Sequence, residues 1–244
     1  MTTVKKTDYG RVIVGTPEEL FRTAVTLVAE AHGKPRTGPF DWALTGGSTP
    51  KEWYRWCVEN RAIPEAVLKS TRFTVSDERC VPLHSDQSNF GTAERLLLSP
   101  LGVPVTQQHP WPVHLLPAEA ADAYEKSRVG FTAKPRGYSV CFLGMGEDGH
   151  TASIFPKSPL LLDTSGRRFA AIEVPGKGWR LTVTPAGLSD SELIVIMALG
   201  ASKAAMLGRV FKSPYNPSET PVQLVKSWRD RVIWLVDPVA AAGV

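Results

Sequence analysis

The chain has 244 residues, 43% of them hydrophobic, and carries a formal charge of +4 at pH 7. This length and composition are ordinary for a cytosolic globular protein that buries a full core. Lysines and arginines occur singly or in pairs with acids between them, which is typical of a solvated surface and predicts no nucleic-acid partner. A mildly basic surface would still favour an anionic substrate.

Three cysteines, Cys57, Cys80 and Cys141, lie far apart and include no C-x-x-C pair, so neither a disulfide framework nor a zinc site is indicated. The N-terminal region contains only one short hydrophobic stretch, at residues 12–14. No segment approaches the roughly 18 uninterrupted apolar residues that a membrane span needs. We therefore expect a soluble, cytoplasmic protein with no membrane partner.

The predicted elements alternate between strands and helices along the chain. Residues 11–14 predict a short strand, and the helix that follows opens at Pro17, repeats apolar residues at helical spacing and ends at Gly33. The other strands are expected at residues 41–44, 72–75, 138–143, 169–174, 180–184, 193–199 and 231–236. The other helices are expected after Pro50 and at residues 88–98, 118–131 and 201–211, with a proline-rich loop at 104–117.

This alternation predicts an α/β protein with a predominantly parallel sheet and helices on both faces. Nothing in the chain resembles a linker between independent domains, so we expect a single domain over residues 1–244. In such sheets, ligands bind where the carboxyl ends of the strands meet their loops. Three loops at predicted strand ends carry chemically active residues.

The first loop, Thr45-Gly-Gly-Ser-Thr-Pro50, follows the strand at 41–44. Gly46 and Gly47 let the backbone approach a ligand without a Cβ in the way, Ser48 offers a hydroxyl, and Pro50 suits the first turn of a helix. The free N–H groups of that helix would attract a phosphate. A plain strand-to-helix turn with a Ser or Thr N-cap is the alternative. The loop is not a Walker loop, because the G-K-[ST] ending is absent.

The second loop, Ser76-Asp-Glu-Arg79, follows the strand at 72–75. Arg79 can hold a phosphate or carboxylate through two hydrogen bonds, and Asp77 can accept hydrogen bonds from sugar hydroxyls. The alternative is a surface turn held by salt bridges.

The third loop, Phe142-Leu-Gly-Met-Gly-Glu-Asp-Gly-His-Thr-Ala-Ser-Ile-Phe-Pro156, has the glycine spacing of a dinucleotide-binding loop. Such a loop needs a long helix after its last glycine, and Pro156 and Pro159 leave room for little more than one turn. We interpret it instead as a turn that brings His150 to the edge of the sheet, beside Asp148. Imidazole is the side chain best suited to proton transfer near neutral pH.

Two further cations stand near predicted element starts: Arg180 at a strand and Lys203 in the first turn of a helix. Each alone could be a solvated surface charge. A lysine near a helix start is electrostatically unfavourable unless an anion occupies the site, which favours a binding role for Lys203.

Together, three stretches resemble the glucosamine-6-phosphate isomerase/6-phosphogluconolactonase family: residues 44–50, residues 76–82 with Ser88-Asn89-Phe90, and residues 143–156. The resemblance runs in order from about residue 10 to residue 236, nearly the whole chain. It implies a Rossmann-like three-layer α/β/α sandwich, which agrees with the alternation of elements.

Within this family the chain looks more like the lactonases than the sugar isomerases. Lactonases carry Asp-Glu-Arg where isomerases usually carry Asp-Glu-Tyr or Asp-Glu-Phe, and this chain has Arg79. Isomerases also typically read Gly-His-Ile-Ala-Phe-Asn-Glu-Pro, whose glutamate moves protons. The equivalent position here is Phe155, which cannot.

The resemblance implies hydrolysis of 6-phospho-D-glucono-1,5-lactone to 6-phosphogluconate in the oxidative pentose phosphate pathway. No metal or organic cofactor is implied, and the protein would be a monomer or a homodimer. By resemblance, His150 is the general base that takes a proton from water, and Asp148 and Asp77 shape the site around it.

The resemblance also assigns the binding groups. Arg79 lies near the bound ligand, and Ser48, Arg180 and Lys203 fall where the family holds the sugar phosphate, next to Gly46 and Gly47. Lactonases often have a Lys-Pro-Pro stretch before the arginine, where this chain has Gly176-Lys-Gly-Trp179, so Lys177 receives no role.

Three alternatives remain open from the sequence. The first is a glucosamine-6-phosphate isomerase or deaminase, and the second is a non-catalytic sugar-phosphate-binding protein, since a pocket alone does not prove turnover. The third is a serine hydrolase, because residues 199–204 are one residue short of a nucleophile elbow around Ser202. All 5 histidines precede Ser202, so the usual order of serine, acid and histidine cannot be built.

Overall fold

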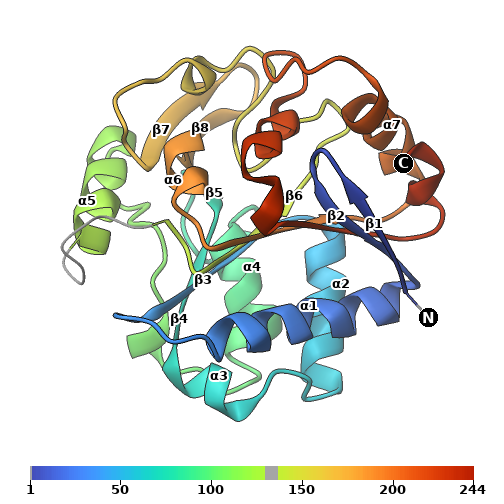
Figure 1. The fold of residues 1–244 in the computed structure, drawn as a ribbon. Coiled ribbons are helices and arrows are strands. Elements are labelled where there is room, and N and C mark those ends of the chain that lie inside the picture. Colours follow the sequence, from blue (N-terminus) through green and yellow to red (C-terminus); the bar gives the residue numbers. More distant parts are fainter. Residues whose placement is uncertain (1, 130–136) are drawn as a thin grey trace.

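The computed structural model describes residues 2–129 and 137–244 of the chain. A seven-stranded sheet with the order β1-β2-β10-β9-β6-β3-β4 crosses the molecule (Figure 1). β1 is antiparallel to β2, and every other neighbouring pair is parallel, as predicted. The strands of this sheet are β1 (Thr3–Thr7), β2 (Gly10–Val14), β3 (Phe40–Leu44), β4 (Thr71–Val75), β6 (Val140–Gly144), β9 (Leu193–Ala198) and β10 (Val232–Val236).

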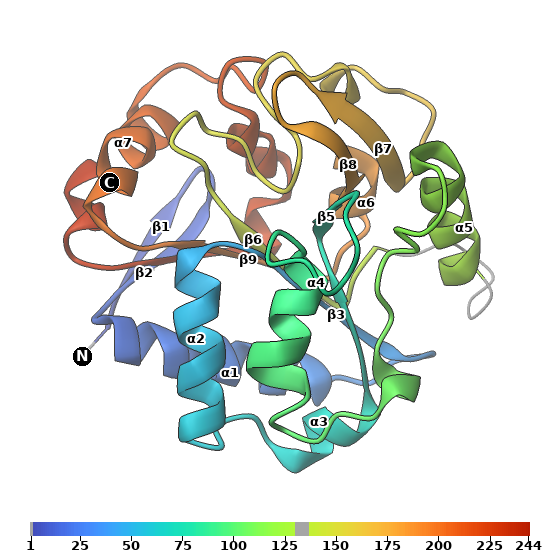
Figure 2. The ribbon, with the colours of Figure 1, turned by 180° about the vertical axis from the view of Figure 1, so that it is seen from behind.

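Helices lie on both sides of this sheet, which confirms the expected three-layer α/β/α arrangement. Figures 1 and 2 show α1 to α4 on one side and α5 to α7 on the other. The helices are α1 (Pro17–His32), α2 (Ser48–Glu59), α3 (Glu65–Ser70), α4 (Asn89–Ala93), α5 (Pro117–Val129), α6 (Pro185–Ser189) and α7 (Ala204–Lys212). Segments of 3-10 helix cover Val105–Gln107, Pro159–Leu161, Ala201–Lys203, Pro221–Arg231 and Ala240–Gly243.

The central strands are buried because they are covered from both sides. All five residues of β3 and all five of β10 are buried, which explains why parallel strands read as nearly continuous apolar runs. Trp42 of β3 packs against Trp53 of α2 and Phe142 of β6, with ring centroids 5.8 and 5.6 Å away. This aromatic cluster fixes β3 and β6 as neighbours, and the loops that follow both strands carry the predicted site residues.

A second, three-stranded sheet contains β5 (Asp77–Arg79), β8 (Gly178–Val183) and β7 (Phe169–Val174), in that order. The strands expected at 169–174 and 180–184 therefore exist, but they lie outside the parallel sheet and pair antiparallel. The physical reason is the short connection between them: Lys177 N–H donates to the Val174 carbonyl over 2.9 Å. A tight turn can join only antiparallel strands.

Several element boundaries differ from those predicted. The helix expected at 88–98 is α4 followed by a π-helical turn at Glu94–Leu98, and the one expected at 201–211 begins as a 3-10 turn. The helix expected at 118–131 is α5, and Gly130 and Phe131 lie outside the described residues. β1, α3, β5 and α6 have no counterpart in the prediction. Among the described residues, no helix has the length and apolar character that crossing a bilayer requires.

Candidate active site

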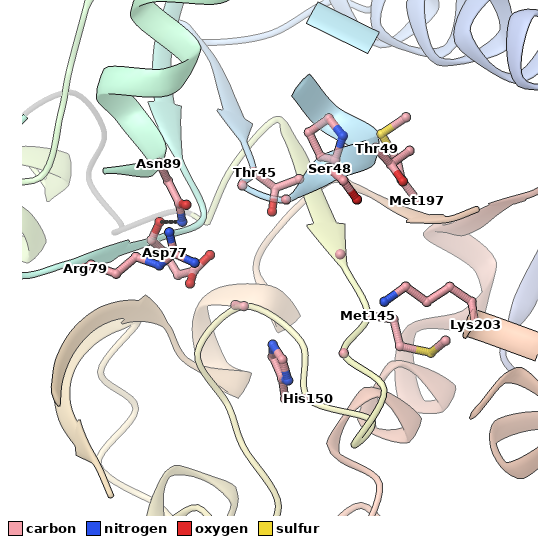
Figure 3. A pocket seen from close by; sticks show the side chains of 16 residues that line it. Thr45, Ser48, Thr49, Asp77, Arg79, Asn89, Met145, His150, Met197 and Lys203 are labelled. Atoms are coloured by element: carbon pink, nitrogen blue, oxygen red, sulfur yellow. Dashed lines mark hydrogen bonds between the residues drawn. The ribbon is translucent and has the colours of Figure 1, made fainter. Parts of the chain in front are cut away.

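A cavity of about 220 Å³ opens where the loops after β3, β4, β6 and β9 meet (Figure 3). These four strands are consecutive neighbours in the sheet. The chain leaves β3 toward β4 on one side and leaves β6 toward β9 on the other, so the strand order reverses between β3 and β6. Open α/β sheets bind ligands at such a reversal, outside the carboxyl ends of the strands.

The loop after β3 forms one wall of the cavity with Thr45, Gly46, Gly47, Ser48, Thr49 and Pro50. Gly47 has φ +117°, a left-handed conformation that favours glycine. A Cβ on Gly46 would lie 2.0 Å from Asn89 Oδ1, so only glycine fits there. No side chain caps α2, which contradicts the alternative of a Ser or Thr N-cap. The first N–H groups of α2 are therefore free to bind an anion.

The loop after β4 sends its two acidic residues in opposite directions. The Glu78 side chain is fully buried away from the cavity and accepts hydrogen bonds from Ser88 Oγ and from the backbone N–H groups of Arg79, Asn89 and Phe90, at 2.7–2.9 Å. Burial raises the pKa of Glu78, and these four hydrogen bonds oppose the rise. Glu78 thus anchors the start of α4, and the alternative of a solvated salt-bridged turn is wrong.

Asp77 lines the cavity with only 8% of its surface exposed. Its Oδ2 accepts a hydrogen bond from Ser153 Oγ at 2.7 Å, and Ser76 Oγ donates to its Oδ1 at 3.3 Å. The Asn89 side chain donates to the Asp77 carbonyl at 2.8 Å and also lines the cavity. Asn89 belongs to the Ser88-Asn89-Phe90 stretch that resembles the family, but no role was predicted for it from the sequence.

Arg79 lines the cavity, and Arg180 lies directly opposite it across the β5–β8 ladder. Burial lowers the pKa of the Arg180 guanidinium, and the neighbouring charge of Arg79 lowers it further. Arg79 Nη1 donates to the Gln87 carbonyl at 2.6 Å. Arg180 is not among the residues that line the cavity. Two like charges facing each other on a ladder repel, so this pair favours a bound anion nearby.

The loop after β6 places His150 at the cavity with 31% of its side chain exposed. Asp148 Oδ1 lies 2.5 Å from His150 Nδ1 and accepts the His150 backbone N–H at 3.1 Å. A Cβ on Gly146 would lie 2.0 Å from His150 Nδ1, so the imidazole rests directly on glycine backbone. A carboxylate acceptor at Nδ1 favours the neutral imidazole tautomer that carries its proton there, and in that tautomer Nε2 has the free lone pair.

Asp148 stands behind the imidazole and is not a lining residue of the cavity. Burial acts to raise the pKa of its carboxyl, but the hydrogen bonds from the His150 backbone and ring outweigh burial and hold that pKa below its ordinary value. The group is therefore an ionised hydrogen-bond acceptor for the imidazole at neutral pH.

Lys203 reaches the cavity from the loop after β9. Figure 3 shows its side chain and that of Arg79 on opposite sides of His150. Lys203 is the N-cap residue of α7, and its side chain makes no capping hydrogen bond. Ser202 is exposed and does not belong to the described residues that line the cavity.

The structure thus brings His150, Asp77, Gly46, Gly47, Ser48, Arg79 and Lys203 around one cavity, with Asp148 and Arg180 directly behind the lining residues. Gly149 is followed by a turn rather than a helix, so the glycine spacing does not build a dinucleotide site. In residues 2–129 and 137–244, no group of three or more His, Cys, Asp or Glu side chains is arranged to hold a metal ion. Met145 and Met197, which also line the cavity, were not predicted.

Residues 15–234 match the family model described as glucosamine-6-phosphate isomerases/6-phosphogluconolactonase. The chain belongs to this family. It is 32% identical over 207 residues to a 6-phosphogluconolactonase from Synechocystis sp., with 83% of each chain covered. It is 34% identical over 203 residues to one from Treponema pallidum, covering 81% of this chain and 83% of that protein.

The family's solved structures share the fold. The 6-phosphogluconolactonase of Trypanosoma brucei superposes with a TM-score of 0.80 and 26% identity, covering 99% of this chain and 100% of that one. The family and the three-layer fold expected from the sequence are both confirmed.

Proposed function

We propose that this chain hydrolyses 6-phospho-D-glucono-1,5-lactone to 6-phosphogluconate, a step of the oxidative pentose phosphate pathway, with His150 as the general base. The reaction is supported by relatives that bear the name 6-phosphogluconolactonase over more than four-fifths of this chain. The observation that carries the assignment of the base is the Asp148–His150 hydrogen bond, which leaves Nε2 able to accept a proton at a cavity with cations on both sides.

The reaction needs one proton to be moved twice. Nε2 of His150 takes a proton from water while the water oxygen attacks the lactone carbonyl carbon, which gives a tetrahedral oxyanion. The bond from that carbon to the ring oxygen then breaks, and the imidazolium returns the proton to the leaving oxygen. Proton transfer of this kind contributes roughly 10² to 10⁴ in rate.

The remaining site residues are proposed to bind and orient the lactone. Ser48 and Lys203, together with the uncapped start of α2, offer a hydroxyl, an ammonium and N–H groups for the phosphate dianion. Arg180 contributes charge from beside Arg79, and Gly46 and Gly47 allow close approach of the backbone. Holding the phosphate fixes the distant carbonyl against His150, which lowers the entropic cost of the reaction.

The proposal is tested by following acid release after adding the protein to freshly generated lactone, with spontaneous hydrolysis subtracted. His150→Ala is expected to remove most turnover while its affinity for the product stays similar. Arg180→Ala is expected chiefly to raise KM. Near-normal turnover by His150→Ala excludes it as the base, and an unchanged KM for Arg180→Ala removes that residue from the phosphate site.

The family also contains glucosamine-6-phosphate isomerases, so ammonia release from glucosamine 6-phosphate is the matched comparison. We expect none, because Phe155 stands beside His150 and has no group that can carry a proton. Failure to turn over either compound, with retained binding, would instead indicate a sugar-phosphate-binding protein.

We further propose that the chain acts in the cytoplasm as one domain over residues 1–244. It would be a monomer or a homodimer that needs no cofactor and binds neither nucleic acid nor membrane.

A further inference from the structure

We propose that Phe155 is a positioning residue for His150: its ring fixes the plane of the imidazole so that Nε2 points at the lactone. This inference rests on the proposed function, because it concerns the same general base. The two rings are stacked, with centroids 4.3 Å apart and planes inclined by 24°. A stack this close restricts rotation of the imidazole about its bond to the chain.

The other contacts of the imidazole leave that rotation incompletely fixed. Asp148 Oδ1 lies 2.5 Å from Nδ1, and a Cβ on Gly146 would lie 2.0 Å from Nδ1 and 2.3 Å from Cε1, so both contacts act on the same side of the ring. Phe155 adds a stacked contact with the ring as a whole. Without this contact the ring could tilt, and small misplacements of reacting groups cost large factors in rate.

A turn in residues 151–154 brings Phe155 back to His150. Ile154 N–H donates to the Thr151 carbonyl at 2.9 Å, and this bond closes the turn. Inside the turn, Ala152 has φ +46°, a left-handed conformation that is unfavourable for a residue with a Cβ. Ser153 of the same turn donates to Asp77 at 2.7 Å. One strained turn therefore sets both the imidazole plane and the Asp77 carboxylate.

The tip of the β7–β8 hairpin contacts the same aromatic ring. Lys177 Nζ lies 5.5 Å from the centroid of Phe155, within range of a cation–π interaction. Phe155 is itself only partly buried. The ring therefore does less for the core than a buried phenylalanine would, and its place against His150 agrees better with a positioning role.

The test compares Phe155→Leu with Phe155→Tyr in the lactone assay. Leucine keeps an apolar side chain but loses the flat face, so kcat is expected to fall about 10- to 100-fold with KM changed by no more than about threefold. Tyrosine keeps the ring and is expected to restore kcat to within about threefold of the parent protein.

Phe211→Leu is the matched control. Phe211 is also partly buried and contacts the rings of Tyr9 and Trp234, with centroids 5.8 and 5.2 Å away, and it is not among the residues that line the cavity. Its loss is expected to lower thermal stability without lowering kcat. Equal kcat losses in the two leucine variants, or no rescue by tyrosine, would overturn the proposal.

Phe155→Met keeps the comparison possible if Phe155→Leu does not fold, and it is expected to show the same loss of kcat.

Failure of this inference is distinct from failure of the proposed function. If the parent protein hydrolyses the lactone and His150→Ala does not, an unimpaired Phe155→Leu removes only the role of Phe155. A parent protein without lactonase activity removes the proposed function itself.

Discussion

At the scale of single residues, neighbours decide what each acidic side chain at the site does. Asp77 and Glu78 are adjacent in the sequence, yet Asp77 faces the cavity, whereas Glu78 is buried and holds the start of α4. Asp148 has a third role, because its Oδ1 accepts the His150 backbone N–H and lies 2.5 Å from Nδ1 of the imidazole. Residue type alone does not separate these roles; strand alternation and the position of α4 do.

Asp148→Asn should disable the base without removing it. An amide can present an N–H to His150 Nδ1, which would move the proton to Nε2 and leave no acceptor facing the lactone. We expect kcat to fall by roughly 10² to 10⁴ with KM little changed. The lactone assay checks this, and Asp163→Asn, on an exposed loop, is the control that should keep full activity.

The same substitution has a consequence for acid stability. Because the folded-state pKa of Asp148 lies below its ordinary value, its carboxylate stabilises the fold above an unfolded pKa of about 3.9, and this contribution is lost as pH falls through the lower, folded pKa. Asp148→Asn should therefore show a shallower loss of stability below about pH 4 in acid unfolding. An unchanged acid profile would contradict this expectation.

At the scale of elements, α1 shows how much a local signal can fix. The Thr16 side chain accepts from Glu19 N–H, Glu19 accepts from Thr16 N–H at 2.9 Å, and Pro17 occupies the first turn. Pro17 and the apolar repeat predicted this helix from the sequence, and the capping box that the structure shows at its start is an equally local feature. The β7–β8 hairpin is the opposite case. Its two strands can be recognised from the local sequence, but the local sequence does not show which sheet they join.

Thr16→Ala tests the contribution of the cap to α1. Loss of the side-chain acceptor at the N-cap is expected to cost about 1 kcal/mol of unfolding free energy. Lactonase activity should be unchanged, because α1 contributes no residue to the cavity. Denaturant unfolding measures the first quantity, and Thr16→Ser should restore it. A loss of kcat in the folded variant would contradict the separation between α1 and the site.

At the scale of the whole molecule, a buried charge cluster joins three elements at the end of the sheet opposite the cavity. Asp41 of β3 lies 2.7 Å from Arg72 Nε on β4 and 3.0 Å from Arg128 Nη2 near the end of α5. All three side chains are at most 16% exposed. The cluster ties the start of β3 to its surroundings, and Thr45 at the other end of that strand lines the site.

Asp41→Asn should destabilise the fold by about 3–5 kcal/mol, because it removes a buried carboxylate that pairs with the Arg72 and Arg128 guanidinium groups. At temperatures where the variant stays folded, we expect kcat to be close to that of the parent protein. Thermal unfolding and the lactone assay measure the two effects separately. A variant as stable as the parent would show that the attraction between Asp41 and the two arginines only offsets the cost of burying the Asp41 carboxylate.

The sequence by itself determined the features that depend on local chemistry. The apolar repeats of the strands and helices, the capping box of α1 and the glycine-rich loops follow from neighbouring residues, and the alternation of predicted elements put His150, Asp77 and Ser48 at strand ends. Their meeting at one cavity was predictable because parallel strands present their carboxyl ends at one edge of a sheet.

Tertiary structure alone decided the rest. The antiparallel sheet of β5, β8 and β7, the pairing of Arg79 with Arg180 and the burial of Glu78 all depend on which segments meet across long separations in the chain. The stack of Phe155 on His150 depends on a backbone conformation at Ala152 that alanine does not favour. Local preference cannot predict these contacts, because packing over the whole molecule outweighs it.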